Sequence, residues 1–213
     1  MKTLLAQRLG LGALNALALL VAAYAFLAYA LWPPGHMVGE KMQAAFSAHP
    51  VLIYGHVFAA ALALALGPWQ FSSRLRRARP QVHRWIGRTY LGVGVLVGGV
   101  FGLLLSRFAQ GGAVGQIGFA LLAVVWLYTG LRGWLAIRAG SVAEHRQWML
   151  RNQALTLAAV SLRIYVSLAL ATPWPFEPLY AAIAWLCWVP NLLLAEWWLR
   201  RAAGQAWVST MHR

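Results

Sequence analysis

Six long apolar runs limit what this chain can fold into more than any other feature of its sequence. Their lengths are close to the roughly 20 residues that an α-helix needs to cross a bilayer. They cover residues 9–31, 50–71, 89–106, 116–137, 153–171 and 179–199. Charged residues make up only 10% of the chain, against about 25% in soluble domains. The sequence therefore predicts an all-α integral membrane bundle of six transmembrane helices, in a single domain over residues 1–213.

The first apolar run also has features of a secretory signal peptide. Lys2 and Arg8 precede it, and Ala28, Tyr29 and Ala30 mimic a cleavage site. A signal core usually spans about 7 to 15 residues, however, and this run is longer. We expect it to be retained as the first span.

The distribution of positive charge predicts the orientation of the bundle. Fifteen of the 18 Lys and Arg residues lie on the side that holds both termini and the loops 72–88 and 138–152, whereas Lys41 and Arg107 lie on the other side and Arg163 lies within a span. Cytoplasmic loops of membrane proteins carry such an excess. Both termini are therefore predicted to be cytoplasmic. Because the charge is divided among loops between apolar runs, the net charge of +14 does not indicate nucleic-acid binding.

Two similar basic segments precede the third and fifth spans. Each begins with a His-Arg pair: His83–Arg84 and His145–Arg146. Both histidines are predicted at the same inner edge of the bilayer, on helices that run in the same direction. Neutral imidazole is a good iron ligand. The pair is therefore a candidate metal site, in which His83 and His145 are the two axial ligands of one b-type haem.

The residues around the two histidines suit the rest of such a cofactor. Arginines can bind haem propionates through charge-assisted, often bidentate hydrogen bonds, and tryptophans and methionine can line the macrocycle. The candidates are Arg84, Arg88, Arg146 and Arg151 for the propionates, and Trp85, Trp148 and Met149 for the walls. Arg and Trp at a membrane boundary also anchor helices and bind anionic lipid headgroups, and this alternative explains much of the same pattern.

Ionisable residues inside the predicted spans are a second group of candidates, because each needs a partner or a function. Arg132 and Glu196 fall at similar depth, which predicts an ion pair between them. Arg163 is near the middle of the fifth span without a carboxylate at its depth. It is expected either to face a water-filled or ligand-filled cavity, or to bond backbone carbonyls and Asn191. His56, seven residues after His49, is too far from it to share a metal.

Two further patterns predict local structure. Gly94, Gly98 and Gly102 are spaced four apart in the third span, so they share one face on which another helix can approach closely. In addition, the loop over residues 32–49 has room for a short interfacial helix.

A family resemblance rests on four segments of the sequence. They are GPWQF at Gly67–Phe71, HRWIGRTY at His83–Tyr90, HRQWMLRNQALTLAAVSLR at His145–Arg163 and WLCWVPNLLLAE at Trp185–Glu196. Together they resemble the predicted bacterial membrane proteins of domain of unknown function 2306. The resemblance implies a multi-pass protein of the bacterial inner membrane and no particular reaction. More distantly, the chain is similar to transmembrane ferric reductases, but residues such as Leu96, Val97 and Ala159 stand where that group has a second histidine on each helix.

Three functions remain open at this stage. The first is a redox protein with one haem that exchanges electrons with a quinone or a membrane redox partner. The second is a non-catalytic accessory subunit that binds membrane lipids, anionic ones in particular. The third is a small carrier that uses Arg163 and His56 as a polar path. No catalytic triad spacing and no HExxH or paired CxxC motif is present, which argues against hydrolase chemistry but leaves open whether the protein is an enzyme.

Overall fold

The structure is a computed structural model that describes residues 2–35 and 40–211, with the side chains of residues 10–35 and 40–202. Every regular element within these residues is helical. The elements are α1 (Lys2–Leu31), α2 (Glu40–Ala48), α3 (Pro50–Gln70), α4 (Ser73–Ala78), α5 (Pro80–Thr89), the π-helix η1 (Tyr90–Val97), α6 (Gly98–Leu105), the 3₁₀-helix η2 (Ser106–Phe108), α7 (Gly112–Arg138), α8 (Val142–Thr156), α9 (Ala158–Leu170), α10 (Phe176–Leu186) and α11 (Val189–Met211).

Six stretches within the described residues are long and apolar enough to cross a membrane. They are Gly10–Leu31, Pro50–Gln70, Pro80–Phe108, Gly112–Arg138, Val142–Leu170 and Phe176–Ala202. The third comprises α5, η1, α6 and η2, the fifth α8 and α9, and the sixth α10 and most of α11. The predicted all-α bundle of six spans is confirmed, and α2 is the short helix expected between the first two spans.

The expectation of basic loops before the third and fifth spans is wrong, because both segments are largely helical. The third span begins at Pro80 and the fifth at Val142. Proline suits the first position of a helix, since it has no N–H to leave unpaired there. The arginine-rich stretch before it forms α4. The backbone N–H of Leu75 donates to the hydroxyl oxygen of Ser72, the N-cap residue, at 3.2 Å. His83 and His145 therefore lie in the first turns of α5 and α8.

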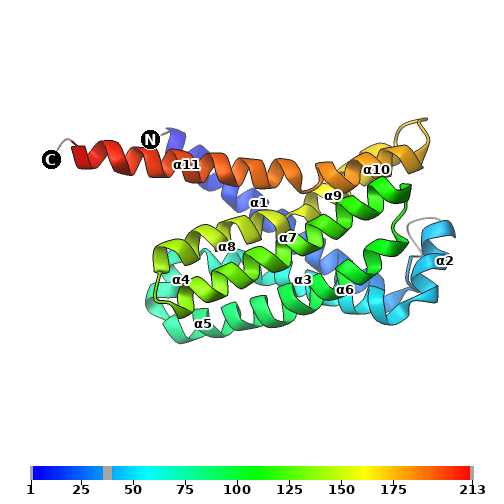
Figure 1. Cartoon of the computed structure of the whole chain (residues 1–213), viewed down its shortest axis with the longest axis horizontal. Coiled ribbons are helices and arrows are strands. Elements are labelled where there is room, and N and C mark those ends of the chain that lie inside the picture. The colour runs from blue at the N-terminus through cyan, green and yellow to red at the C-terminus, as the bar shows by residue number, and fades with distance from the viewer. Residues whose placement is uncertain (1, 36–39, 212–213) are drawn as a thin grey trace.

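The spans lie side by side along the long axis of the molecule (Figure 1). The start of α1, the end of α11, and α4 and α5 lie together at one end, whereas α2 and the turn between α9 and α10 lie at the other. We call the first the arginine-rich end, because the segment Ser73–Thr89 carries six arginines. That this end faces the cytoplasm stays a prediction.

The main core lies where α3, the third span, α7, α8 and the sixth span meet. Its buried members are Ala63, Tyr90, Val95, Trp126, Met149, Leu155, Ala158, Cys187 and Trp188. α1 packs outside this group, mainly against α3 and more weakly against α9. Large apolar side chains such as Leu20, Leu168 and Leu193 are exposed on the outer surface, as expected of a surface that contacts lipid.

The predicted glycine face packs against α3, as expected. A Cβ atom added at Gly94 would lie 2.8 Å from the Cβ of Ala63, and one added at Gly98 would lie 3.2 Å from the backbone nitrogen of Ala60. At Gly102 it would lie 2.7 Å from Nδ1 of His56. The absence of side chains on this face therefore lets α3 and the third span approach closely and leaves room for the His56 ring.

We expect Gly94→Ala to destabilise the protein by about 1–3 kcal/mol, because the added methyl group has no space against α3. Gly92→Ala on the same helix is the matched control, since an added Cβ there meets nothing within 4 Å. Unfolding in detergent would measure both variants. Equal stabilities would contradict the packing role of this face.

Candidate functional site

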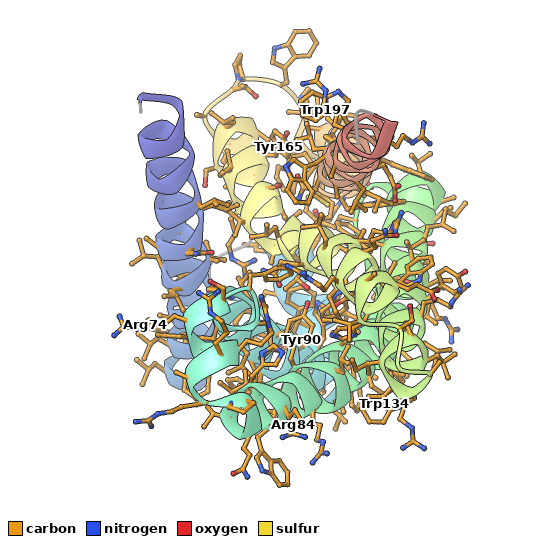
Figure 2. The ribbon with its side chains drawn as sticks, turned by 90° about the vertical axis from the view of Figure 1, so that its left-hand side faces the viewer. Arg74, Arg84, Tyr90, Trp134, Tyr165 and Trp197 are labelled. Carbon is orange, nitrogen blue, oxygen red and sulfur yellow. The ribbon has the colours of Figure 1, made fainter. Side chains whose placement is uncertain are left out.

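A network of buried polar side chains joins three spans at the centre of the bundle. Tyr90 is the first residue of η1. Its hydroxyl oxygen lies 2.7 Å from both Asn152 Oδ1 and Thr156 Oγ1 on α8. Trp126 on α7 donates its indole N–H to Thr156 Oγ1 at 2.9 Å. Tyr90 and Asn152 are almost completely buried, and Figure 2 shows Tyr90 surrounded by the helices. We call Tyr90, Trp126, Asn152 and Thr156 the polar core.

Asn152 connects the polar core most extensively. Its amide nitrogen donates to the Trp126 carbonyl at 2.8 Å and to the Thr129 hydroxyl at 2.9 Å, while its Oδ1 accepts from Tyr90. Since a polar group buried without partners is costly, these bonds fix how the third span, α7 and α8 sit against one another. Sequence reasoning missed this role, because it assigned Asn152 to a loop.

Gln153 extends the network toward α3. Its Oε1 lies 3.4 Å from the Tyr90 hydroxyl, and its amide group packs against Gly67 so closely that a Cβ at that position would overlap it. The glycine of the GPWQF segment is thus explained by the space that a buried glutamine from α8 occupies.

The two histidines lie on the same side of the polar core. His83 is the fourth residue of α5 and His145 the fourth of α8. Each precedes its member of the polar core, Tyr90 or Asn152, by seven residues, or about 10 Å along a helix. The pair therefore lies toward the arginine-rich end, and His145 is close enough to His83 to interact with it electrostatically.

The environments of the two imidazoles differ. Nδ1 of His145 lies 2.8 Å from the carbonyl oxygen of Gly133. Because a carbonyl only accepts, this nitrogen carries a proton, which leaves Nε2 as the atom that can bind a metal when the ring is neutral. Nδ1 of His83 is buried and has no hydrogen-bond partner among the described residues. Arg76 on α4 also lies within electrostatic range of His83.

The arginines predicted around the histidines differ in their exposure and in their contacts. Arg84, Arg88 and Arg146 are exposed, and the guanidinium carbon of Arg88 lies 5.2 Å from the centre of the Trp85 ring. Figure 2, viewed from the arginine-rich end, shows Arg84 at the periphery of the bundle. Their binding of propionates stays a prediction, as does the role of Arg151, which pairs with Glu196.

Residues 53–199 match the family described as "Predicted membrane protein (DUF2306)". The chain belongs to this DUF2306 family. The matched region contains both histidines and the whole polar core, so the resemblance drawn from the sequence motifs is confirmed. No curated protein and no solved structure is significantly similar to the chain.

Two ion pairs in the DUF2306 region flank Trp148. Arg132 on α7 pairs with Glu144 at 3.1 Å, and Arg151 pairs with Glu196 on α11, with Nη2 to Oε2 at 3.0 Å. Both guanidinium carbons lie less than 5 Å from the centre of the Trp148 ring, at 4.8 and 4.7 Å. The predicted pair Arg132–Glu196 is wrong, because α8 packs between α7 and α11 and supplies a nearer partner to each.

The remaining polar candidates lie deeper in the bundle. His56 Nδ1 donates to the Gly98 carbonyl at 2.9 Å, and Arg163 donates to the Ala159 carbonyl at 2.9 Å. Of the two alternatives for Arg163, a bond to a backbone carbonyl is therefore present, whereas Asn191 bonds Ser161 and the Ala154 carbonyl. His56 and Arg163 are within electrostatic range of one another. Transport through these two residues stays a prediction.

We expect Asn152→Leu to lower the free energy of unfolding by about 2 kcal/mol, because it leaves the groups that bonded Asn152 buried without partners. Gln147→Leu, at an exposed position of the same helix, is the control. Equilibrium unfolding in detergent micelles compares the two. A loss no larger than that of the control would show that the polar core does not hold the spans together.

Proposed function

We propose that this DUF2306 protein is a membrane redox protein that holds one b-type haem between His83 and His145 at its arginine-rich end. The single observation that carries the proposal is the pairing of these imidazoles. They lie in the first turns of two different spans, each seven residues before its member of the polar core, and within electrostatic range of one another.

The hydrogen bond of His145 supports a role as a ligand. Histidines that bind metals commonly donate their other ring N–H to a carbonyl or carboxylate, which fixes the tautomer and the ring orientation. Nδ1 of His145 donates to Gly133 in this way. This bond leaves Nε2 as the ring nitrogen available to a metal.

The buried Nδ1 of His83 points to the same conclusion. Buried polar atoms without a partner are rare in proteins and call for an explanation. Binding of a cofactor by this imidazole would explain why its Nδ1 has no partner among the described residues. The described residues contain no group of three or more His, Cys, Asp or Glu that could hold a metal ion. A haem needs only two ligands from the protein, because the macrocycle supplies the others. Two histidines therefore suit a haem better than a bare ion.

The chain's own residues have three tasks in this proposal. His83 and His145 would hold the iron, and Arg76, close to His83, would join the predicted Arg84, Arg88 and Arg146 as a partner for the propionates, while Arg151 stays paired with Glu196. Trp148 and the buried Met149 lie beside His145. On the side of the histidines away from the arginine-rich end, the buried side chains of the polar core fill the space between the helices. When bound, the haem would supply one-electron chemistry, with a quinone or a membrane redox protein as the partner.

The dithionite-reduced absorption spectrum tests the proposal. Protein purified from cells supplied with a haem precursor should show a shifted Soret band and an α band. His83→Ala and His145→Ala should each lower haem content at least about tenfold, because an axial ligand is lost. His49→Ala is the control, since that ring stacks on Phe108 at the opposite end of the third span.

Two results would overturn the haem proposal: a wild-type protein without these bands, or unchanged bands in His83→Ala. Size-exclusion profiles of the variants establish that they remain folded.

A second function is favoured by the exposed arginine–tryptophan pairs of this end. Arg138 lies 5.9 Å from the Trp134 ring and Arg201 4.0 Å from the Trp197 ring. Such pairs suit the headgroup region of an anionic membrane surface. An accessory subunit of this kind would co-purify with anionic lipid, lack haem bands, and be unaffected by His83→Ala.

We propose further that the arginine-rich end faces the cytoplasm of a bacterial inner membrane. Cysteines introduced at Ala139 and Thr172 test this, because both positions are exposed in turns at opposite ends and the native Cys187 is buried. A membrane-impermeant maleimide should label Thr172→Cys in intact spheroplasts and Ala139→Cys only after lysis. The reverse pattern would invert the topology.

A further inference from the structure

Arg163 on α9 faces a shallow groove between α1 and α9. The groove has a volume of about 360 Å³, and its walls are almost entirely apolar, with Leu17 and Val21 from α1 and Val160, Ile164 and Leu168 from α9. Ile164 and Leu168 are exposed. Ser167, one helical turn beyond Arg163, also lines the groove. Arg163 therefore lies between this lipid-facing groove and the interior of the bundle, where Tyr29 and Tyr180 are within electrostatic range.

Among the residues that the structure describes, no acidic side chain pairs with Arg163. The chain contains only four acidic residues. Glu144, Glu196 and Glu177 pair with Arg132, Arg151 and Lys41, and the fourth, Glu40, lies in the first turn of α2. Among the described side chains, Arg163 forms no ion pair.

The depth of Arg163 makes this charge costly. It lies seven residues before the end of α9 at Leu170, which is about 10 Å along the helix. A charged side chain inside the apolar part of a membrane is costly unless it has a partner. The Tyr24 ring, 6.0 Å from the guanidinium carbon, offsets only part of this, because a cation–π contact at such a distance is weak.

Arg163 also has donors to spare. A guanidinium carries five N–H donors, and Nη1 bonds the Ala159 carbonyl. The rest suit a bidentate contact with a carboxylate or phosphate. Three tyrosines, Tyr24, Tyr29 and Tyr180, lie within electrostatic range of the guanidinium. Their side chains combine an apolar ring with a polar hydroxyl group.

We propose that this groove binds a membrane lipid with an anionic head group, a carboxylate or a phosphate, whose acid group contacts Arg163 and Ser167. The acyl chain lies along Leu17, Val21 and Val160, which are nearer the arginine-rich end than Arg163. The lipid therefore belongs to the leaflet at the opposite end of the bundle. Its negative charge replaces the carboxylate that the chain lacks at this depth.

Photo-crosslinking in bilayers tests the proposal. The protein is reconstituted in phosphatidylcholine with a small fraction of one diazirine-bearing probe: a fatty acid, a phosphatidylglycerol or a phosphatidylcholine. Crosslinked peptides are mapped by mass spectrometry in high salt, which screens the exposed arginines far more than a partly buried one. The anionic probes should label the α1 segment around Leu17–Val21 and the α9 segment around Val160–Leu168 well above the zwitterionic probe.

Variants connect this labelling to the charge. Arg163→Gln should reduce it at least about tenfold, because a hydrogen-bonded ion contact is worth about 1.5–3 kcal/mol. Arg138→Gln, an exposed arginine of α7, should leave it unchanged. Leu17→Trp fills the groove from the lipid-facing α1 and should reduce labelling with Arg163 intact, even if Arg163→Gln folds poorly.

The comparison of the two anionic probes identifies the head group, and stronger labelling by either supports the site. Equal labelling by phosphatidylcholine, or labelling that persists in both groove variants, would overturn the proposal. Haem spectra do not enter this test, so its outcome is independent of the function proposed for the histidines.

Discussion

The hydrogen bonds of Asn152 are the constraint on which the rest of the bundle depends. Lipid tails are as apolar as leucine, so helices in a membrane gain little from apolar contact alone, and polar bonds between them contribute to their association. Asn152 bonds α7 through Trp126 and Thr129 and the third span through Tyr90. The glycine face then brings the third span against α3. The histidine pair can keep a fixed geometry because both of its helices are tied together two turns away.

Much of the fold follows from the sequence because burial in lipid makes length and hydropathy reliable signals. Six spans and the glycine face were predicted, and the loop over residues 32–49 was expected to have room for a short helix such as α2. The helix starts were not, since residues such as Arg84 and Gln147 are charged or polar but favourable in helices. Reading them as loop also concealed the polar core: Asn152 and Thr156 follow His145 at helical spacing, yet the predicted span began only after Asn152.

The ion pairs show why the site could be predicted only in part. Depth along a helix can be read from residue number, and it placed Arg132 and Glu196 in similar layers. Which helix lies between two others cannot be read in this way, and α8 separates α7 from α11. Trp148 between Arg132 and Arg151 is a consequence of that order. Arg163 was recognised as an isolated charge because so few carboxylates occur in the chain; its place beside α1 required the structure.

The π-helical turn of the third span has a consequence for how that span presents its faces. An α-helix rotates by about 100° per residue, so residues four apart drift by about 40° around the axis. A π-helical turn contains more residues and rotates less with each, so the drift between Gly94 and Gly98 opposes that between Gly98 and Gly102. All three glycines can then meet α3. An α-helical turn in place of η1 would instead give both glycine spacings a drift of about 40° in the same direction, so that Gly94 and Gly102 would lie about 80° apart around the axis and could not both meet α3 in the same way.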